Sequence, residues 1–194
     1  YNLQNIEDSL EFIGKANKGQ EFMSDVDIKR VEEISLYKYY ENSIERNFLS
    51  DDEVYNISIR KGTLTKEEKD IMNSHATLSY EMLSALPFPK KYSNIMHIAV
   101  NHHEKLNGKG YPRGLSEQEI ALEDRILILA DIFEALSSND RPYKGVKTLS
   151  EIFKILDFMV KDGEIDKDLL DFFKNSRAFK EYCETELLNE QLDV

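Results

Sequence analysis

The side chains best suited to chemistry in this sequence lie in one short run, residues 102–115. The run opens with His102 and His103, which are half of the four histidines in the 194-residue chain. A loop rich in glycine follows, with Gly108, Gly110, Pro112 and Gly114. Neutral imidazole is the commonest protein metal ligand, and glycine lets a backbone approach a bound group closely. The run therefore suggests a metal site, and the plain alternative is a surface histidine pair before a turn.

Two further residues could contribute to such a site. Asp131 lies in the apolar segment 126–133, where an unpaired carboxylate would be costly to desolvate. We therefore expect a cation or strong donors beside it, and the alternatives are a salt bridge to Arg125 or a helix cap. His75 has a weaker claim, because a solvent-facing histidine is the default. His97 has no partner pattern and is assigned to the core or the surface.

The elements that would position these residues are helices. Thr65 and Glu68 have capping-box spacing and open a helix predicted to run to about residue 86, with His75 inside it. Its apolar stripe is Ile71, Met72, Leu78, Met82 and Leu83. A helix over about 91–103 ends in the histidine pair, and the apolar helix 122–136 carries Asp131. Ligand sites are commonly built between the helices of a bundle.

The rest of the chain is also predicted to be helical. Apolar residues at helical spacing indicate helices over 3–13, from about 25, and over 149–160, 166–174 and 177–188. Gly14 and Gly19 are expected to end the first of these, and Ser24 with Asp25 to cap the second. Residues 54–59 read as a short strand or a buried extended segment. The predicted fold is an all-α bundle, with an N-terminal helical segment at 1–53 and a C-terminal portion at 54–194.

Composition limits the kinds of partner. The net charge of −12 argues against a nucleic acid polymer, because such binding depends on neutralising many phosphates. It leaves room for a small phosphate-bearing ligand at a local cluster of metal ions and basic side chains. A single cysteine, Cys183, fits a reducing cytoplasm. The sequence contains no apolar run of membrane-spanning length, so we expect a cytoplasmic protein with no membrane contact in this chain.

Several segments together resemble the HD-GYP family of metal-dependent phosphodiesterases. They are His102–Glu104, Asn107–Leu115, Arg125–Ile126, Ala130–Leu136 and Asp140–Lys144. Gly62–Glu68, ahead of His75, resembles the family's segment before a mid-domain ligand histidine. The resemblance covers at least residues 54–174. It implies an HD-type helical bundle in a bacterial signalling protein that hydrolyses cyclic di-GMP or a related cyclic dinucleotide.

The resemblance also implies roles for individual residues. It makes His75, His102, His103 and Asp131 ligands of a two- or three-metal centre that usually holds iron or manganese. Mixed imidazole and carboxylate ligands suit such ions, whereas thiolates would favour zinc. The implied chemistry is metal-assisted hydrolysis, in which a water activated between two ions attacks the phosphorus.

Other residues would contact the substrate or a partner. Arg141 and Lys144 match positions that resemble the family's phosphate contacts, with ordinary surface charge as the alternative. The signature triplet is Gly110-Tyr111-Pro112. Its tyrosine would border the substrate or dock a signalling partner, and the sequence does not separate these roles. Glu104 and Glu134 are candidates to accept a proton or to support the ligands.

The sequence lacks the His-Asp dipeptide from which the family takes part of its name, because no histidine is followed by aspartate. Three explanations are open: the chain is a C-terminal part of a longer protein, the segment was lost naturally, or a segment is omitted. We favour the first and expect little or no activity from the chain by itself. The alternatives are a non-catalytic module that binds a cyclic dinucleotide or docks a partner, and a structural domain with relic histidines.

Overall fold

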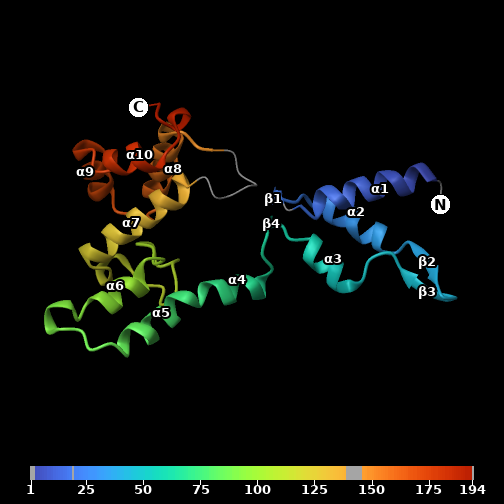
Figure 1. Ribbon diagram of the computed structural model, residues 1–194, viewed down its shortest axis with the longest axis horizontal. Coiled ribbons are helices and arrows are strands. Elements are labelled where there is room, and N and C mark those ends of the chain that lie inside the picture. Colours follow the sequence, from blue (N-terminus) through green and yellow to red (C-terminus); the bar gives the residue numbers. More distant parts are fainter. Residues whose placement is uncertain (1–2, 19, 139–145, 194) are drawn as a thin grey trace. The chain divides into compact units, whose positions relative to one another are not determined.

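The computed structural model describes residues 3–18, 20–138 and 146–193 (Figure 1). The chain divides into two compact units, residues 1–70 and 71–194, and each is described by itself. The described residues are mainly helical, and their strands are short, which confirms the all-α class and is consistent with the HD-domain fold. The division at 53 and 54 drawn from the sequence stays a prediction.

The first unit consists of helices and two small antiparallel strand pairs. Its helices are α1 (Leu3–Ala16), α2 (Asp25–Ser35) and α3 (Asp51–Ile57). Strand β1 (Gln20–Phe22) pairs with β4 (Lys61–Gly62), and β2 (Lys38–Glu41) pairs with β3 (Ile44–Asn47). A small core of Ala16, Met23, Val31 and Leu49 holds the unit together. Ser24 caps α2 as predicted, whereas Gly14 lies inside α1 rather than ending it.

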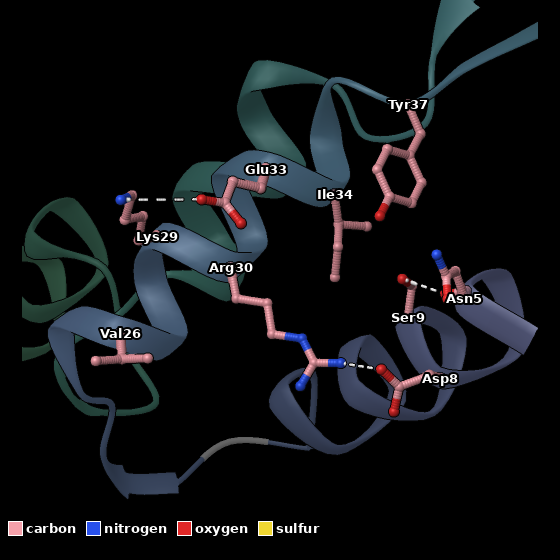
Figure 2. A pocket seen from close by; sticks show the side chains of 9 residues that line it. All are labelled: Asn5, Asp8, Ser9, Val26, Lys29, Arg30, Glu33, Ile34 and Tyr37. Carbon is pink, nitrogen blue, oxygen red and sulfur yellow. Dashed lines mark hydrogen bonds and ion pairs between the residues drawn. The ribbon is translucent and has the colours of Figure 1, made fainter. Parts of the chain in front are cut away.

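A surface groove of about 600 Å³ runs between α1 and α2 (Figure 2). Arg30 of α2 reaches across it to the carboxylate of Asp8 on α1, at 2.5 Å. Lys29 and Glu33 pair at 4.0 Å along the same helix. Because these charges are matched within the groove itself, we interpret it as the seam between two packed helices.

Helix α3 corrects the expectation of a strand or extended segment over residues 54–59. Ser50 accepts a hydrogen bond from the Glu53 N–H, and the Glu53 carboxylate accepts one from the Ser50 N–H. This reciprocal cap satisfies two amide groups at the helix start. The apolar residues Val54 and Ile57 then lie on one side of a helix and pack against the small core.

The second unit contains the helices that carry the predicted site. They are α5 (His75–Ser84), α6 (Ile95–Asn101), α7 (Leu122–Ser137), α8 (Leu149–Lys161), α9 (Lys167–Ser176) and α10 (Lys180–Glu186). Single 3₁₀ turns lie at 90–92, 117–119 and 189–191. The core is formed mainly by α7 to α10, where Leu149, Ile152, Leu156 and Leu170 are fully buried. The predicted helices over 122–136 and 149–160 are confirmed.

The single helix predicted over 65–86 is two helices, α4 (Lys66–Asn73) and α5. The Thr65–Glu68 cap is present, with both reciprocal hydrogen bonds formed. The break falls at Ser74, whose hydroxyl donates to the Ile71 carbonyl at 2.6 Å and so competes with the helical hydrogen-bond pattern. The apolar stripe of this segment does not form a buried face, because Ile71 is 72% and Met82 is 74% exposed.

Candidate metal centre

Three of the predicted ligand residues come together at the ends of two packed helices. His75 is the first residue of α5, and His102 and His103 follow directly after α6. Helix α6 packs against both α5 and α7, and α7 carries Asp131. The packing of α6 on α5 and α7 therefore places donor side chains from three separate segments of the sequence in one region.

The imidazole nitrogens converge on a common point. The Nε2 atom of His75 lies 3.0 Å from Nε2 of His103 and 3.3 Å from Nε2 of His102. Ligand atoms of the three histidines all lie within 4.8 Å of one another. Two nitrogens bound to one ion at about 2.1 Å, with an angle of roughly 100°, would be roughly 3.2 Å apart. The two separations measured from His75 Nε2 thus fit ligands of a single metal ion.

The hydrogen bonds of two rings fix which nitrogen is available. Nδ1 of His75 lies 2.6 Å from the Met72 carbonyl, and Nδ1 of His102 lies 2.6 Å from the Ala99 carbonyl. A carbonyl oxygen can only accept, so both Nδ1 atoms carry a proton, and Nε2 of each ring is the nitrogen that faces the other ring and can offer a lone pair. Two facing lone pairs repel unless a proton or a cation lies between them. A metal ion would satisfy this arrangement, and such carbonyl partners are typical of ligand histidines.

The electrostatics of the third ring, His103, favour the neutral form that a metal requires. Burial lowers the pKa of His103 below its ordinary value, neighbouring His102 and His75 lower it further, and the Asp131 carboxylate opposes the shift. The neutral form is the metal-binding form of imidazole. His103 is thereby prepared to act as a ligand close to neutral pH.

Asp131 lies beside the histidine cluster. Its Oδ2 atom is 3.7 Å from Nδ1 of His103, and the metal-ligand group found among the described residues consists of the three histidines. Its side chain is 37% exposed, so the argument from a deeply buried carboxylate was wrong. Helix α7 leaves Ile126 and Leu127 exposed as well, because this side of the helix is not covered within the unit. Ligation by Asp131 stays a prediction.

Arg125 pairs with the carboxylate of Asp166 and not with that of Asp131, the partner that the sequence suggests as an alternative. Its guanidinium donates to Asp166 at 2.7 Å, to the Ile120 carbonyl at 3.0 Å and to the Glu117 carbonyl at 2.6 Å. These bonds connect the start of α7 to the start of α9. The proposed Arg125–Asp131 salt bridge is therefore replaced by a structural connection away from the cluster.

The signature loop packs on the cluster through its tyrosine. The rings of Tyr111 and His103 have centroids 4.7 Å apart with planes inclined by 32°, and the Tyr111 N–H donates to the His103 carbonyl at 3.2 Å. Burial raises the pKa of the Tyr111 hydroxyl, and the charge of Asp131 raises it further. The phenol therefore stays protonated at neutral pH and can donate a hydrogen bond close to the histidines.

The remaining candidate residues are buried, exposed or outside the described part of the chain. Glu104 is 1% exposed, and its two carboxylate oxygens accept from the backbone N–H groups of Arg113 and Leu115, a role that sequence reasoning missed. Glu134 is exposed on α7. His97 is exposed and contacts Tyr80 at a centroid distance of 5.8 Å, in agreement with its assignment outside the site. The predicted phosphate contacts Arg141 and Lys144 lie outside the described residues.

Comparison with known proteins gives a consistent group of relatives. A family model described as "HD domain" matches residues 51–169. The chain is 43% identical over 98 residues to a cyclic di-GMP phosphodiesterase of Thermotoga maritima, a match that covers 50% of this chain and 26% of that protein. It is 36% identical over 121 residues to 3′3′-cGAMP-specific phosphodiesterase 1 of Vibrio cholerae, covering 62% of this chain and 27% of the relative.

A third relative is the cyclic di-GMP phosphodiesterase response regulator RpfG of Xanthomonas campestris, 39% identical over 94 residues. That match covers 48% of this chain and 24% of the relative. The chain thus spans about a quarter of the length of these relatives. Separately, none of the helices in the described part of the chain combines the length and apolar character needed to cross a membrane.

Proposed function

The chain belongs to the HD-domain family, and from this premise we propose that it forms part of a metal-dependent phosphodiesterase for cyclic dinucleotides. One observation carries the proposal: the convergent Nε2 atoms of His75, His102 and His103. The names of the relatives, which are phosphodiesterases of cyclic di-GMP and 3′3′-cGAMP, support the substrate class.

The chain's own residues would contribute in distinct ways. The three imidazoles would hold the ion, with Asp131 as a further ligand. Tyr111 would present its protonated hydroxyl beside the bound substrate, and Arg141 and Lys144 would pair with its phosphates. When bound, divalent ions supply a water nucleophile at neutral pH and offset the charge that develops on the phosphate. Iron or manganese suits the imidazole and carboxylate donors.

Three clustered histidines are too few for a complete centre of two ions, since phosphodiesterases of this kind use paired metals about 3.5–4 Å apart. We therefore propose that a His-Asp-bearing portion of the full protein completes the centre. The 194-residue chain alone would then bind metal but hydrolyse little or no cyclic di-GMP. A cytoplasmic location, and a signalling partner docked at the Gly110–Pro112 loop, are further parts of this proposal.

The experiment compares His102→Ala with His97→Ala in the full protein and in the 194-residue chain. Both variants remove an imidazole at or near α6, but only His102 lies in the cluster. We expect His102→Ala to lose bound manganese by elemental analysis and to abolish cyclic di-GMP hydrolysis by the full protein, while His97→Ala keeps both. A manganese-loaded full protein without turnover would refute the catalytic proposal.

The second candidate is a module that binds a cyclic dinucleotide without hydrolysing it. The absence of a His-Asp dipeptide from these residues favours it. It predicts that the chain still binds cyclic di-GMP after His102→Ala and in the presence of a chelator, as measured by calorimetry. Loss of binding on removing metal would favour the phosphodiesterase instead.

A further inference from the structure

We propose that Glu104 is a positioning residue of the metal centre, because its buried carboxylate fixes the loop that holds Tyr111 against His103. The inference rests on the proposed metal site and adds a residue that acts through others. It starts from a difference among the three rings. Backbone carbonyls orient His75 and His102, whereas the ion-pair partner of His103 Nδ1, Asp131, is 3.7 Å away, beyond hydrogen-bond distance. Nδ1 of His103 thus lacks the backbone carbonyl that holds the other two rings, and ring packing contributes to its orientation.

The His103 ring packs against the rings of His102, Tyr111 and His75, with centroids 3.9, 4.7 and 4.9 Å away. Of these, Tyr111 lies on the loop that Glu104 holds. Oε1 of Glu104 accepts from the Arg113 N–H at 2.7 Å, and Oε2 accepts from the Leu115 N–H at 2.9 Å. A carboxylate that is 1% exposed depends on such donors, and charge-assisted bonds of this kind are stronger than neutral ones. One side chain thus binds the backbone two and four residues after Tyr111.

Two more contacts make this attachment rigid. The Arg113 guanidinium donates to the side chain of Asn101 at 2.6 Å, and Asn101 is itself buried at the end of α6. A Cβ atom added at Gly110 would lie 2.4 Å from the Cα atom of Glu104, so the loop backbone lies directly on this residue. The backbone of Tyr111 is therefore held between Gly110 and Arg113, in a position from which its ring packs on His103.

The test compares Glu104→Gln with Asp124→Asn. Asp124 is a matched control, because it is also a buried carboxylate that accepts from a backbone N–H, that of Ala121, at the start of α7. In the metal-free protein, nuclear Overhauser effects between the Tyr111 and His103 rings report their packing. Co²⁺ titration followed by d–d absorption reports ligand geometry and affinity.

We expect Glu104→Gln to lose the ring-to-ring effects, to change the Co²⁺ spectrum and to weaken Co²⁺ binding about 10–100-fold, the usual cost of disturbing outer residues of a metal site. Asp124→Asn should lower stability but keep all three signals. Tyr111→Ala should reproduce the Co²⁺ result with the loop bonds intact, which covers the case in which Glu104→Gln does not fold.

Ring contacts that persist in Glu104→Gln would overturn the inference, and so would equal losses in Asp124→Asn or an unchanged Co²⁺ spectrum in Tyr111→Ala. The inference and the proposed function fail separately. If the unmodified protein binds no Co²⁺, the metal site is refuted, while the ring contacts in metal-free Glu104→Gln still decide whether Glu104 positions Tyr111.

Discussion

At the scale of single residues, the protonation of His103 connects the site to pH. Its folded-state pKa lies below the ordinary 6.5, because it is partly buried and next to His102. The unfolded chain then binds more protons than the folded chain between these two pKa values. Acidification through this window therefore removes stability from the metal-free protein, and below the lowered pKa the loss is complete.

This gives a first prediction for His103→Gln. The free energy of unfolding of the unmodified protein, relative to that of the variant, should fall as pH is lowered from about 7.5 to about 5.5. The fall should become steep below about pH 6.5, where the histidine of the unfolded chain takes up its proton. Urea unfolding at several pH values measures the difference. A difference that stays constant over this range would show that His103 titrates alike in both states. His97→Gln provides the exposed-histidine control.

The histidine pair also shows what sequence can predict at this scale. Adjacent residues stay adjacent in the fold, so His102 and His103 had to be near one another, and the resemblance added His75. The burial of Asp131 could not be obtained in the same way. An apolar helix has several apolar sides, and which of them is covered depends on neighbouring helices rather than on local sequence.

At the scale of elements, the connection between α7 and α9 makes a second prediction. Asp166 caps α9 by accepting from the Leu169 N–H at 3.0 Å and pairs with Arg125. Burial alone would raise its pKa, but the hydrogen bonds from Arg125 and Leu169 lower it overall. This stability is present above the ordinary pKa of 3.8 and is lost as pH falls through the lowered value.

We expect Asp166→Ala to lower the free energy of unfolding by about 1–3 kcal/mol at neutral pH, because it removes a helix cap and leaves the half-buried Arg125 without its carboxylate. Asp166→Asn, which keeps a capping oxygen, should cost less. Asp171→Ala is the control, since Asp171 makes an exposed pair with Lys167 worth little. Equal effects of Asp166→Ala and Asp171→Ala in urea unfolding would contradict the prediction.

Helix ends explain which elements were predictable. The Thr65–Glu68 spacing correctly predicts a cap. The same spacing at Ser50–Glu53 also forms a cap, and it starts a helix where an extended segment is expected from the sequence. The break at Ser74 depends on one hydroxyl bonding to the Ile71 carbonyl, and serine occurs inside many continuous helices. Capping pairs are therefore readable from sequence, but a local competition for one carbonyl is not.

At the scale of the whole molecule, metal binding should act as a stabilising ligand. An ion that binds only the folded chain adds about 2.7 kcal/mol at 100 times its Kd. We expect saturating Mn²⁺ to raise hydrogen-exchange protection of the core amides Ile152 and Leu156 by this amount, and a chelator to reverse it. His102→Ala should abolish the effect and His97→Ala should keep it. Protection that is insensitive to Mn²⁺ would argue against the site.

The hydrogen bonds from His75 and His102 to backbone carbonyls also affect the entropy of metal binding. Each ring is tied to a carbonyl three residues earlier in the chain, so its rotamer freedom is lost on folding rather than when an ion arrives. Ring orientation is then set locally, within or just ahead of α5 and within α6. Selectivity among ions of different radius would then depend on the separation of two helix ends. The packing of α5 on α6 sets that separation, and with it the distance between the ligand nitrogens.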